Sequence, residues 1–194
     1  MGNGEAWIQT LEGKKLTPLN LQVEQVGSIQ EIAHALSVKV RFTGQTKSPY
    51  SVAEHCVRGS RQLSPAFAGA FLLHELSEVY LPDIAAPLKP YVKVQNPNPS
   101  RDPIPWNTLE EQHMHVILKA LGLFSIEPLI YSDEVSETDR RMLLTEKRDL
   151  CAPEPEPWGV PGEPYVERIR DPWLPGLARD MFLSRFAELF QVQP

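Results

Sequence analysis

The chain has 194 residues, a net charge of −6 and an apolar fraction of 42%, as expected for an ordinary globular protein. The acidic balance argues against a dedicated nucleic-acid-binding protein, because such proteins usually present a basic stripe. The longest apolar run, residues 66–73, is too short to cross a bilayer, and residues 1–9 lack the features of a secretory signal. Two cysteines without a CxxC pair fit a reducing compartment. We therefore expect a cytoplasmic protein without membrane or nucleic-acid partners.

The predicted elements are mostly helices. Residues 6–26 alternate loosely between apolar and polar side chains and predict a short extended segment or hairpin. Capping residues then mark a series of helices. We predict them at residues 29–36, 52–63, 66–80, 108–121, 136–150 and 176–190. The proline-rich stretches 97–105 and 151–175 are poor places for a helix, because proline lacks an amide donor. The prediction is an all-α fold, a single domain over residues 1–194 with a small N-terminal extended segment.

Three ionisable residues follow the most apolar helix. His74 and Glu75 offer a nitrogen and an oxygen ligand to a divalent metal ion. On a helix they are turned by about 100° from each other, so both can reach one point between them, and Glu78 shares a face with His74. Charged groups next to a long apolar stretch are costly unless they are paired or bind metal. The alternative is an ordinary solvated helix end, which the three residues taken alone would favour.

A second histidine, His55, lies near the start of the preceding predicted helix. If the two helices form an antiparallel hairpin, we expect His55 and His74 to lie nearer opposite ends. The spacing alone therefore does not show that the two histidines converge.

Several ordered motifs between about residues 6 and 150 carry a family resemblance. His55 lies in Tyr-Ser-Val-Ala-Glu-His, His74 and Glu75 in Leu-Leu-His-Glu-Leu-Ser-Glu-Val-Tyr, and Asp139 in Glu-Thr-Asp-Arg-Arg-Met. With the strings Ile-Ala-His-Ala-Leu-Ser, Val-Arg-Phe-Thr-Gly-Gln and Ala-Pro-Leu-Lys, the sequence resembles the HD-domain phosphohydrolase superfamily. It is similar to a phage-encoded branch that includes dATP triphosphohydrolases.

The resemblance implies a compact HD-domain helical bundle and a divalent metal ion held by His55, His74, Glu75 and Asp139. Glu75 stands where the family usually has aspartate, and its extra methylene can still place an oxygen on the ion. Zinc, cobalt and manganese are the first candidates, with magnesium as a further ion beside the phosphates. Residues 151–175 and the helix 176–190 lie outside the resemblance.

The resemblance also assigns roles around the metal. Glu78 matches an acidic position that handles protons or positions water, for which a carboxylate is suited. The matches to substrate-binding positions are the phosphate-facing Arg41 and Lys89 and the base-pocket candidates Phe42, Thr43 and Pro87. The alternatives are that Glu78 is an ordinary surface glutamate and that Arg41 and Lys89 are ordinary exposed basic residues. For Phe42, Thr43 and Pro87 the alternative is ordinary packing in the protein interior.

The implied activity is that of a metal-dependent deoxynucleoside triphosphate triphosphohydrolase. We expect dATP to be cleaved to deoxyadenosine and triphosphate by attack of a metal-bound water on the α-phosphorus. A 5′-deoxyribonucleotidase acting on a dNMP is the alternative within this class, and a catalytically inactive metal-binding nucleotide sensor is the alternative of another class. The resemblance further implies a homo-oligomer, located in the host cytoplasm if the gene is phage-encoded.

Overall fold

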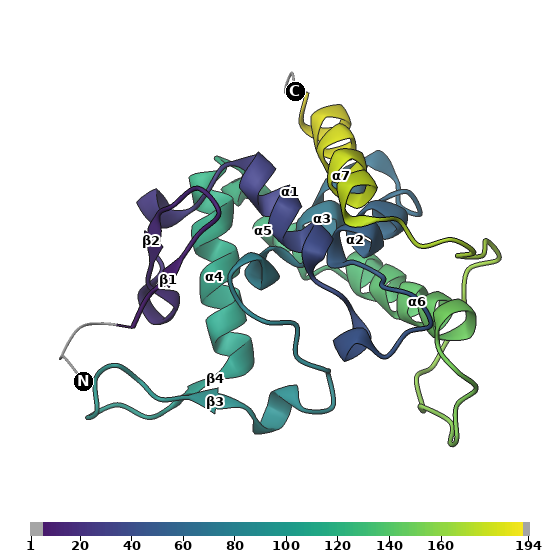
Figure 1. Ribbon diagram of the computed structural model, residues 1–194, viewed down its shortest axis with the longest axis horizontal. Helices are drawn as coiled ribbons and strands as arrows, with labels where there is room; N and C mark the ends of the chain where they lie inside the picture. Colours follow the sequence, from purple (N-terminus) through teal and green to yellow (C-terminus); the bar gives the residue numbers. More distant parts are fainter. Residues whose placement is uncertain (1–5, 192–194) are drawn as a thin grey trace.

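The computed structural model of the protein describes residues 6–191, and most of its elements are helices (Figure 1). The prediction of a mostly helical fold is confirmed. The α-helices are α1 (Ile29–Val38), α2 (Val52–Ser60), α3 (Pro65–Leu73), α4 (Trp106–Ala120), α5 (Glu127–Ile130), α6 (Asp133–Leu150) and α7 (Pro175–Phe190). The strands are β1 (Ile8–Gln9), β2 (Lys15–Leu16), β3 (Lys93–Val94) and β4 (Ile104–Pro105). They form two antiparallel hairpins, β1–β2 and β3–β4.

The first two helix starts agree with the predicted caps. The side chains of Ser28 and Ser51 accept hydrogen bonds from the backbone N–H groups of Glu31 and Glu54. Each cap satisfies one of the amide donors that a helix start leaves unpaired. The side chain of Glu54 accepts a hydrogen bond from the backbone N–H of Trp173, at 2.7 Å. This bond ties the segment after α6 to α2.

Two later helix starts differ from the prediction. Neither Thr108 nor Ser136 is a cap: α4 begins at Trp106 directly after Pro105, and α6 begins at Asp133. The cap of α6 is Ser132, whose side chain accepts from the backbone N–H of Val135. Serine and threonine at spacings typical of a cap occur more often than helix starts, and the sequence did not separate them. The short α5 and the β3–β4 hairpin were also not predicted.

The helix predicted over residues 66–80 is wrong in its second half. The α-helix α3 ends at Leu73, and a separate 3-10 turn follows at Leu76–Val79. Between them Glu75 has φ −104° and ψ 19°, which is not an α-helical conformation. The chain is therefore bent at His74 and Glu75, the two residues with the strongest sequence signal for metal binding.

The C-terminal helix completes the main core. In Figure 1, α7 lies beside α1, α2 and α3, with which it packs. Ala178, Phe182 and Phe186 are its buried residues, and they belong to the same apolar cluster as the side chains of α1 to α3. The proline-rich segment between α6 and α7 contains no helix or strand, as predicted. No helix within residues 6–191 combines the length and apolar character that crossing a membrane requires.

A glycine allows close approach of α2 and α3. A Cβ atom at Gly59 would lie 2.0 Å from the buried ring of Phe71, so no other residue fits without displacing that ring. The ring of Phe71 packs against both His55 and His74, with centroid distances of 5.4 and 4.3 Å. The absence of a side chain at Gly59 thus helps to bring the two histidines together.

Candidate metal centre

His55 lies in the first turn of α2 and is fully buried. Its Nδ1 is 2.6 Å from Oε1 of Glu146, which is also fully buried. Burial would raise the pKa of Glu146, but Arg41 and His55 outweigh it and lower the pKa below the usual value. The ionised carboxylate can only accept, so Nδ1 of His55 carries the proton and donates it. The Nε2 lone pair of His55 is left free to bind a cation.

His74 follows directly on the last residue of α3. Its Nδ1 is 2.6 Å from the backbone carbonyl oxygen of Phe71, which can only accept, so Nδ1 donates and Nε2 is again left free. The two Nε2 atoms of His55 and His74 lie 3.3 Å apart. The expectation that a helical hairpin would separate them is wrong. A chain that reverses between α2 and α3 brings the start of the first helix beside the end of the second.

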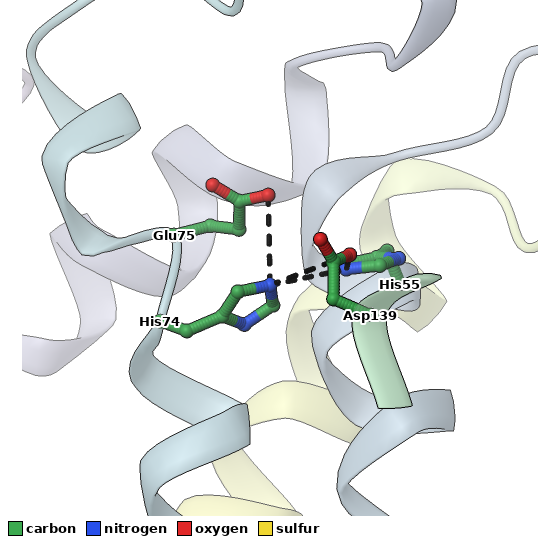
Figure 2. Close-up of side chains that lie close together, drawn as sticks. All are labelled: His55, His74, Glu75 and Asp139. Atoms are coloured by element: carbon green, nitrogen blue, oxygen red, sulfur yellow. Dashed lines mark hydrogen bonds and ion pairs between the residues drawn. The ribbon is translucent and has the colours of Figure 1, made fainter. Parts of the chain in front are cut away.

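Two carboxylates complete the cluster (Figure 2). Oε1 of Glu75 lies 3.6 Å from Nε2 of His74, and Oδ1 of Asp139 lies 3.2 Å from Nε2 of His55. One ligand atom from each of the four residues lies within 4.8 Å of the other three. His74 and Glu75 lie at the bend after Leu73, and both side chains reach the same cluster, as predicted for adjacent residues. The side chain of Asp139 is 43% exposed, so the cluster borders solvent beside α6.

The four residues fit a divalent metal ion. Two imidazole lone pairs that face each other at 3.3 Å repel, so a proton or a metal cation must lie between them. Oδ1 of Asp139 is buried and makes no hydrogen bond among the described residues. A bound cation would satisfy this buried oxygen. In a tetrahedral site with metal–ligand distances of about 2.1 Å, neighbouring ligand atoms lie roughly 3.4 Å apart. Four of the six separations between the ligand atoms, 3.2 to 3.8 Å, lie close to that value, and all six are within 4.8 Å.

The charges of the cluster also favour a cation. Burial would raise the pKa of Asp139, but the neighbouring imidazoles of His55 and His74 hold it well below the usual value. Burial likewise opposes ionisation of Glu75, while His74 and Arg41 lower its pKa. Both carboxylates are therefore ionised. Burial would lower the pKa of His74, but Glu75 and Asp139 outweigh it and raise the pKa well above normal. Metal binding would release this proton.

Contacts with Arg41 and Glu146 hold the candidate ligands in place. Glu146 was not predicted from the sequence. Nε of Arg41 donates to Oε2 of Glu146 at 3.2 Å, and a terminal nitrogen of Arg41 donates to Oε1 of Glu75 at 3.2 Å. Glu146 in turn accepts from His55, so ligands on both sides of the cluster are connected through Arg41. The signal for Glu146 is its position seven residues after Asp139, two turns along the same helix face.

Glu78 lies beside the cluster in the 3-10 turn. The prediction that it shares a continuous helix with His74 is wrong. It is 2% exposed, and its Oε2 has no hydrogen-bond partner among the described residues. Burial, followed by the charges of Glu75 and Asp83, raises the pKa of Glu78 to about 9. Without a metal ion, Glu78 therefore carries a proton at neutral pH.

The predicted substrate residues are not equally close to the cluster. Arg41 contacts Glu75 directly, and Phe42 follows it with a half-buried ring. Lys89 pairs with Glu110 at 2.8 Å. Burial would lower the pKa of Lys89, but the bond to Glu110 and the charge of Glu75 raise it. Thr43 and Pro87 are exposed, and the described residues show no hydrogen bond or ion pair that links either to the four candidate ligands.

The fold and the cluster together define a mostly helical protein with a candidate divalent-metal site. The chain is 34% identical over 190 residues to the uncharacterized protein YfdR of Escherichia coli K12, covering 97% of this chain and 98% of YfdR. The chain belongs to the family of YfdR. It is also 34% identical over 98 residues to the uncharacterized protein RCAP_rcc00048 of Rhodobacter capsulatus, covering 43% of this chain and 47% of that protein. No protein-family model matches the sequence.

Proposed function

We propose that the protein is an HD-type, metal-dependent phosphohydrolase that acts on a deoxynucleotide. The observation that carries the proposal is the convergence of His55, His74, Glu75 and Asp139 on one point, in the chain order of the HD-domain ligands. The outer bonds of the two histidines strengthen it, because metal-bound histidines usually donate their second ring nitrogen to a carboxylate or a backbone carbonyl. The first substrate to test is dATP, cleaved to deoxyadenosine and triphosphate.

The side chains around the cluster supply the remaining parts of such a reaction. A divalent ion held by the four ligands would polarise a phosphate oxygen and favour ionisation of water. Glu78, buried beside the cluster, carries a carboxyl group that, when protonated, is suited to give a proton to the 5′ oxygen as the bond between that oxygen and phosphorus breaks. Arg41 lies at the edge of the cluster and presents a guanidinium that can bind phosphate oxygens.

A dNMP is the second candidate substrate, and a specific observation favours it. Arg41 already binds two carboxylates, those of Glu75 and Glu146. Lys89 is paired with Glu110. A triphosphate would require these cations to exchange partners, whereas a monophosphate held mainly by the metal requires fewer basic contacts.

Product analysis after incubation with each dNTP and dNMP tests the proposal. The protein as purified is first analysed for bound metals, and then assayed with zinc, cobalt, manganese and magnesium. We expect deoxynucleoside together with triphosphate from a dNTP, or with phosphate from a dNMP. Glu78→Ala is expected to lower turnover and to leave metal binding intact. Arg41→Ala is expected to weaken the binding of triphosphates more than the binding of monophosphates. Hydrolysis of dNMPs alone would establish the nucleotidase alternative. A filled metal site without turnover of any nucleotide would contradict the proposal and favour a sensor. Sedimentation of the same preparations tests the expected homo-oligomer.

A further inference from the structure

The backbone is strained beside Arg41. Phe42 and Thr43 are consecutive residues with φ of 56° and 51°, in the left-handed region that side chains other than glycine rarely adopt. Such a conformation is unfavourable, and this kind of strain is concentrated at functional sites. The strained residue Phe42 thus carries a large aromatic ring directly after Arg41, which contacts the candidate ligand Glu75.

An aromatic side chain from the proline-rich segment meets this ring. Trp158 lies 6.2 Å from Phe42 between ring centroids, with the planes inclined by 43°. Trp158 is 42% exposed, although tryptophan usually buries most of its surface. The two rings thus form a partly open aromatic surface, made by two segments more than one hundred residues apart in the sequence.

The segment that carries Trp158 is held in place along α6. An ion pair between Lys147 and Glu154 fixes its beginning. Further along, the backbone N–H of Tyr165 donates to the hydroxyl of Thr145 at 2.9 Å, and Arg148 donates to the carbonyl of Tyr165 at 2.7 Å. These bonds attach the segment to the helix that supplies Asp139 and Glu146.

Each aromatic ring is accompanied by a cation. The guanidinium carbon of Arg41 lies 5.8 Å from the centroid of Phe42, and Nζ of Lys147 lies 5.0 Å from the centroid of Trp158. Both cations are paired with carboxylates, Arg41 with Glu75 and Glu146 and Lys147 with Glu154, so the two rings are the part of this surface that is open to a ligand. The surface is continuous through Arg41 with the candidate metal cluster and matches a ligand that carries a flat aromatic ring beside a group bound at the metal. A nucleotide has this chemistry, and its base can stack on any exposed aromatic face.

We infer that Trp158, together with Phe42, stacks against the base of the substrate and is a specificity-determining residue of the site. The inference rests on the proposed function for the identity of its ligand. It gives the proline-rich segment a role in binding, because that segment supplies one of the two rings.

Calorimetric titration of the full-length, metal-containing protein tests the inference. The probes are deoxyadenosine, which is the nucleoside product from dATP and from dAMP, and inorganic phosphate, which has no base. We expect Trp158→Ala to weaken deoxyadenosine binding roughly 5- to 100-fold, the range for loss of one base–aromatic stack. Phosphate affinity and metal content should stay unchanged. Trp158→Phe should retain most of the affinity, because it keeps a ring. Val166→Ala, in the same segment and 95% exposed, is the matched control.

The outcomes separate the inference from the proposed function. If Trp158→Ala binds deoxyadenosine like the wild type while the wild type cleaves nucleotides, the inference is wrong and the proposed function stands. If the variant loses phosphate and deoxyadenosine binding to the same extent, Trp158 has only a structural role and the inference is also wrong. Selective loss of deoxyadenosine binding without any turnover in the wild type would support the inference and contradict the proposed catalysis.

Discussion

Asp139 and Glu146 lie two helical turns apart on one face of α6, where Asp139 offers an oxygen to the candidate metal centre and Glu146 accepts a hydrogen bond from His55. One helix therefore supplies both a candidate ligand and the group that orients another. The orientation matters because it selects the tautomer: with the proton held on Nδ1, His55 can bind a cation only through Nε2. The rigidity of the helix fixes the distance between the candidate ligand Asp139 and the orienting residue Glu146.

Removal of the Glu146 carboxylate is expected to weaken metal binding without removing a ligand. Glu146→Ala should lower metal affinity about 10- to 100-fold, as is usual for groups that orient a metal ligand. Glu146→Gln should cost less, because its amide oxygen can still accept from His55. Competition with a coloured chelator measures the affinity, and Glu134→Gln, an exposed residue of the same helix, is the control. Unchanged affinity in Glu146→Ala would show that His55 does not need this partner.

Glu75, which the resemblance to HD-domain proteins places where aspartate is usual, gives a second prediction. Glu75→Asp is expected to keep metal binding, because a carboxylate oxygen remains beside His74, and turnover should stay the same or rise. The shorter side chain should loosen the contact with Arg41, now 3.2 Å. Glu75→Ala should weaken metal binding strongly. Metal analysis and nucleotide turnover measure both effects. An alanine variant with full metal content and full rate would remove Glu75 from the ligand set.

Much of the fold could be predicted because its signals are local. The serines that cap α1 and α2 and the apolar run of α3 depend only on neighbouring residues. The bend at Glu75 could not be predicted in this way, because the same residues are compatible with a continuing helix. The metal cluster itself came from a family resemblance, since the spacing of His55 and His74 did not show that they meet.

The residues that sequence reasoning missed depend on long-range contacts. The position of Glu146 seven residues after Asp139 places it on the same face of α6, but its contact with His55, ninety-one residues away, is found only once α6 is placed against α2. Trp158 lies in a segment whose composition predicts only an extended loop, and its proximity to Phe42 follows from bonds to α6. In both cases the residue type was visible in the sequence, but its partner was not.

The close approach of α2 and α3 gives a third prediction. Gly59→Ala should displace the ring of Phe71, since the new Cβ would lie 2.0 Å from it. Overpacking of this kind costs about 1–3 kcal/mol in stability. Because Phe71 packs against His55 and His74, metal affinity should fall as well. Thermal unfolding with and without added zinc measures both, and Gly176→Ala, where an added Cβ meets nothing within 4 Å, is the control. A normal metal affinity in Gly59→Ala would show that the packing of α2 against α3 does not affect metal binding.

The buried carboxyl of Glu78 gives a prediction about pH. In the folded, metal-free protein its pKa is raised to about 9, with burial as the largest cause, whereas an exposed glutamate in the unfolded chain has a pKa of about 4.3. The folded state therefore keeps a proton that the unfolded state loses between these two values. The stabilisation is complete below the lower pKa and is lost as the pH rises to about 9, and the full shift corresponds to a loss on the order of 6 kcal/mol. Glu78→Gln stays neutral at every pH and should remove this dependence.

Thermal unfolding of chelator-treated protein between pH 5 and 9 measures the effect. The melting temperature of Glu78→Gln should exceed that of the wild type by an amount that grows with pH, roughly 2–4 °C for each kcal/mol in a chain of this size. A divalent ion should reduce the difference, because its positive charge beside Glu75 stabilises the ionised form of Glu78. Glu134→Gln is again the control, since its carboxyl is exposed. Parallel curves for Glu78→Gln and the wild type over the whole range would mean that Glu78 is ionised in the folded protein, and would remove its proposed role as a proton donor.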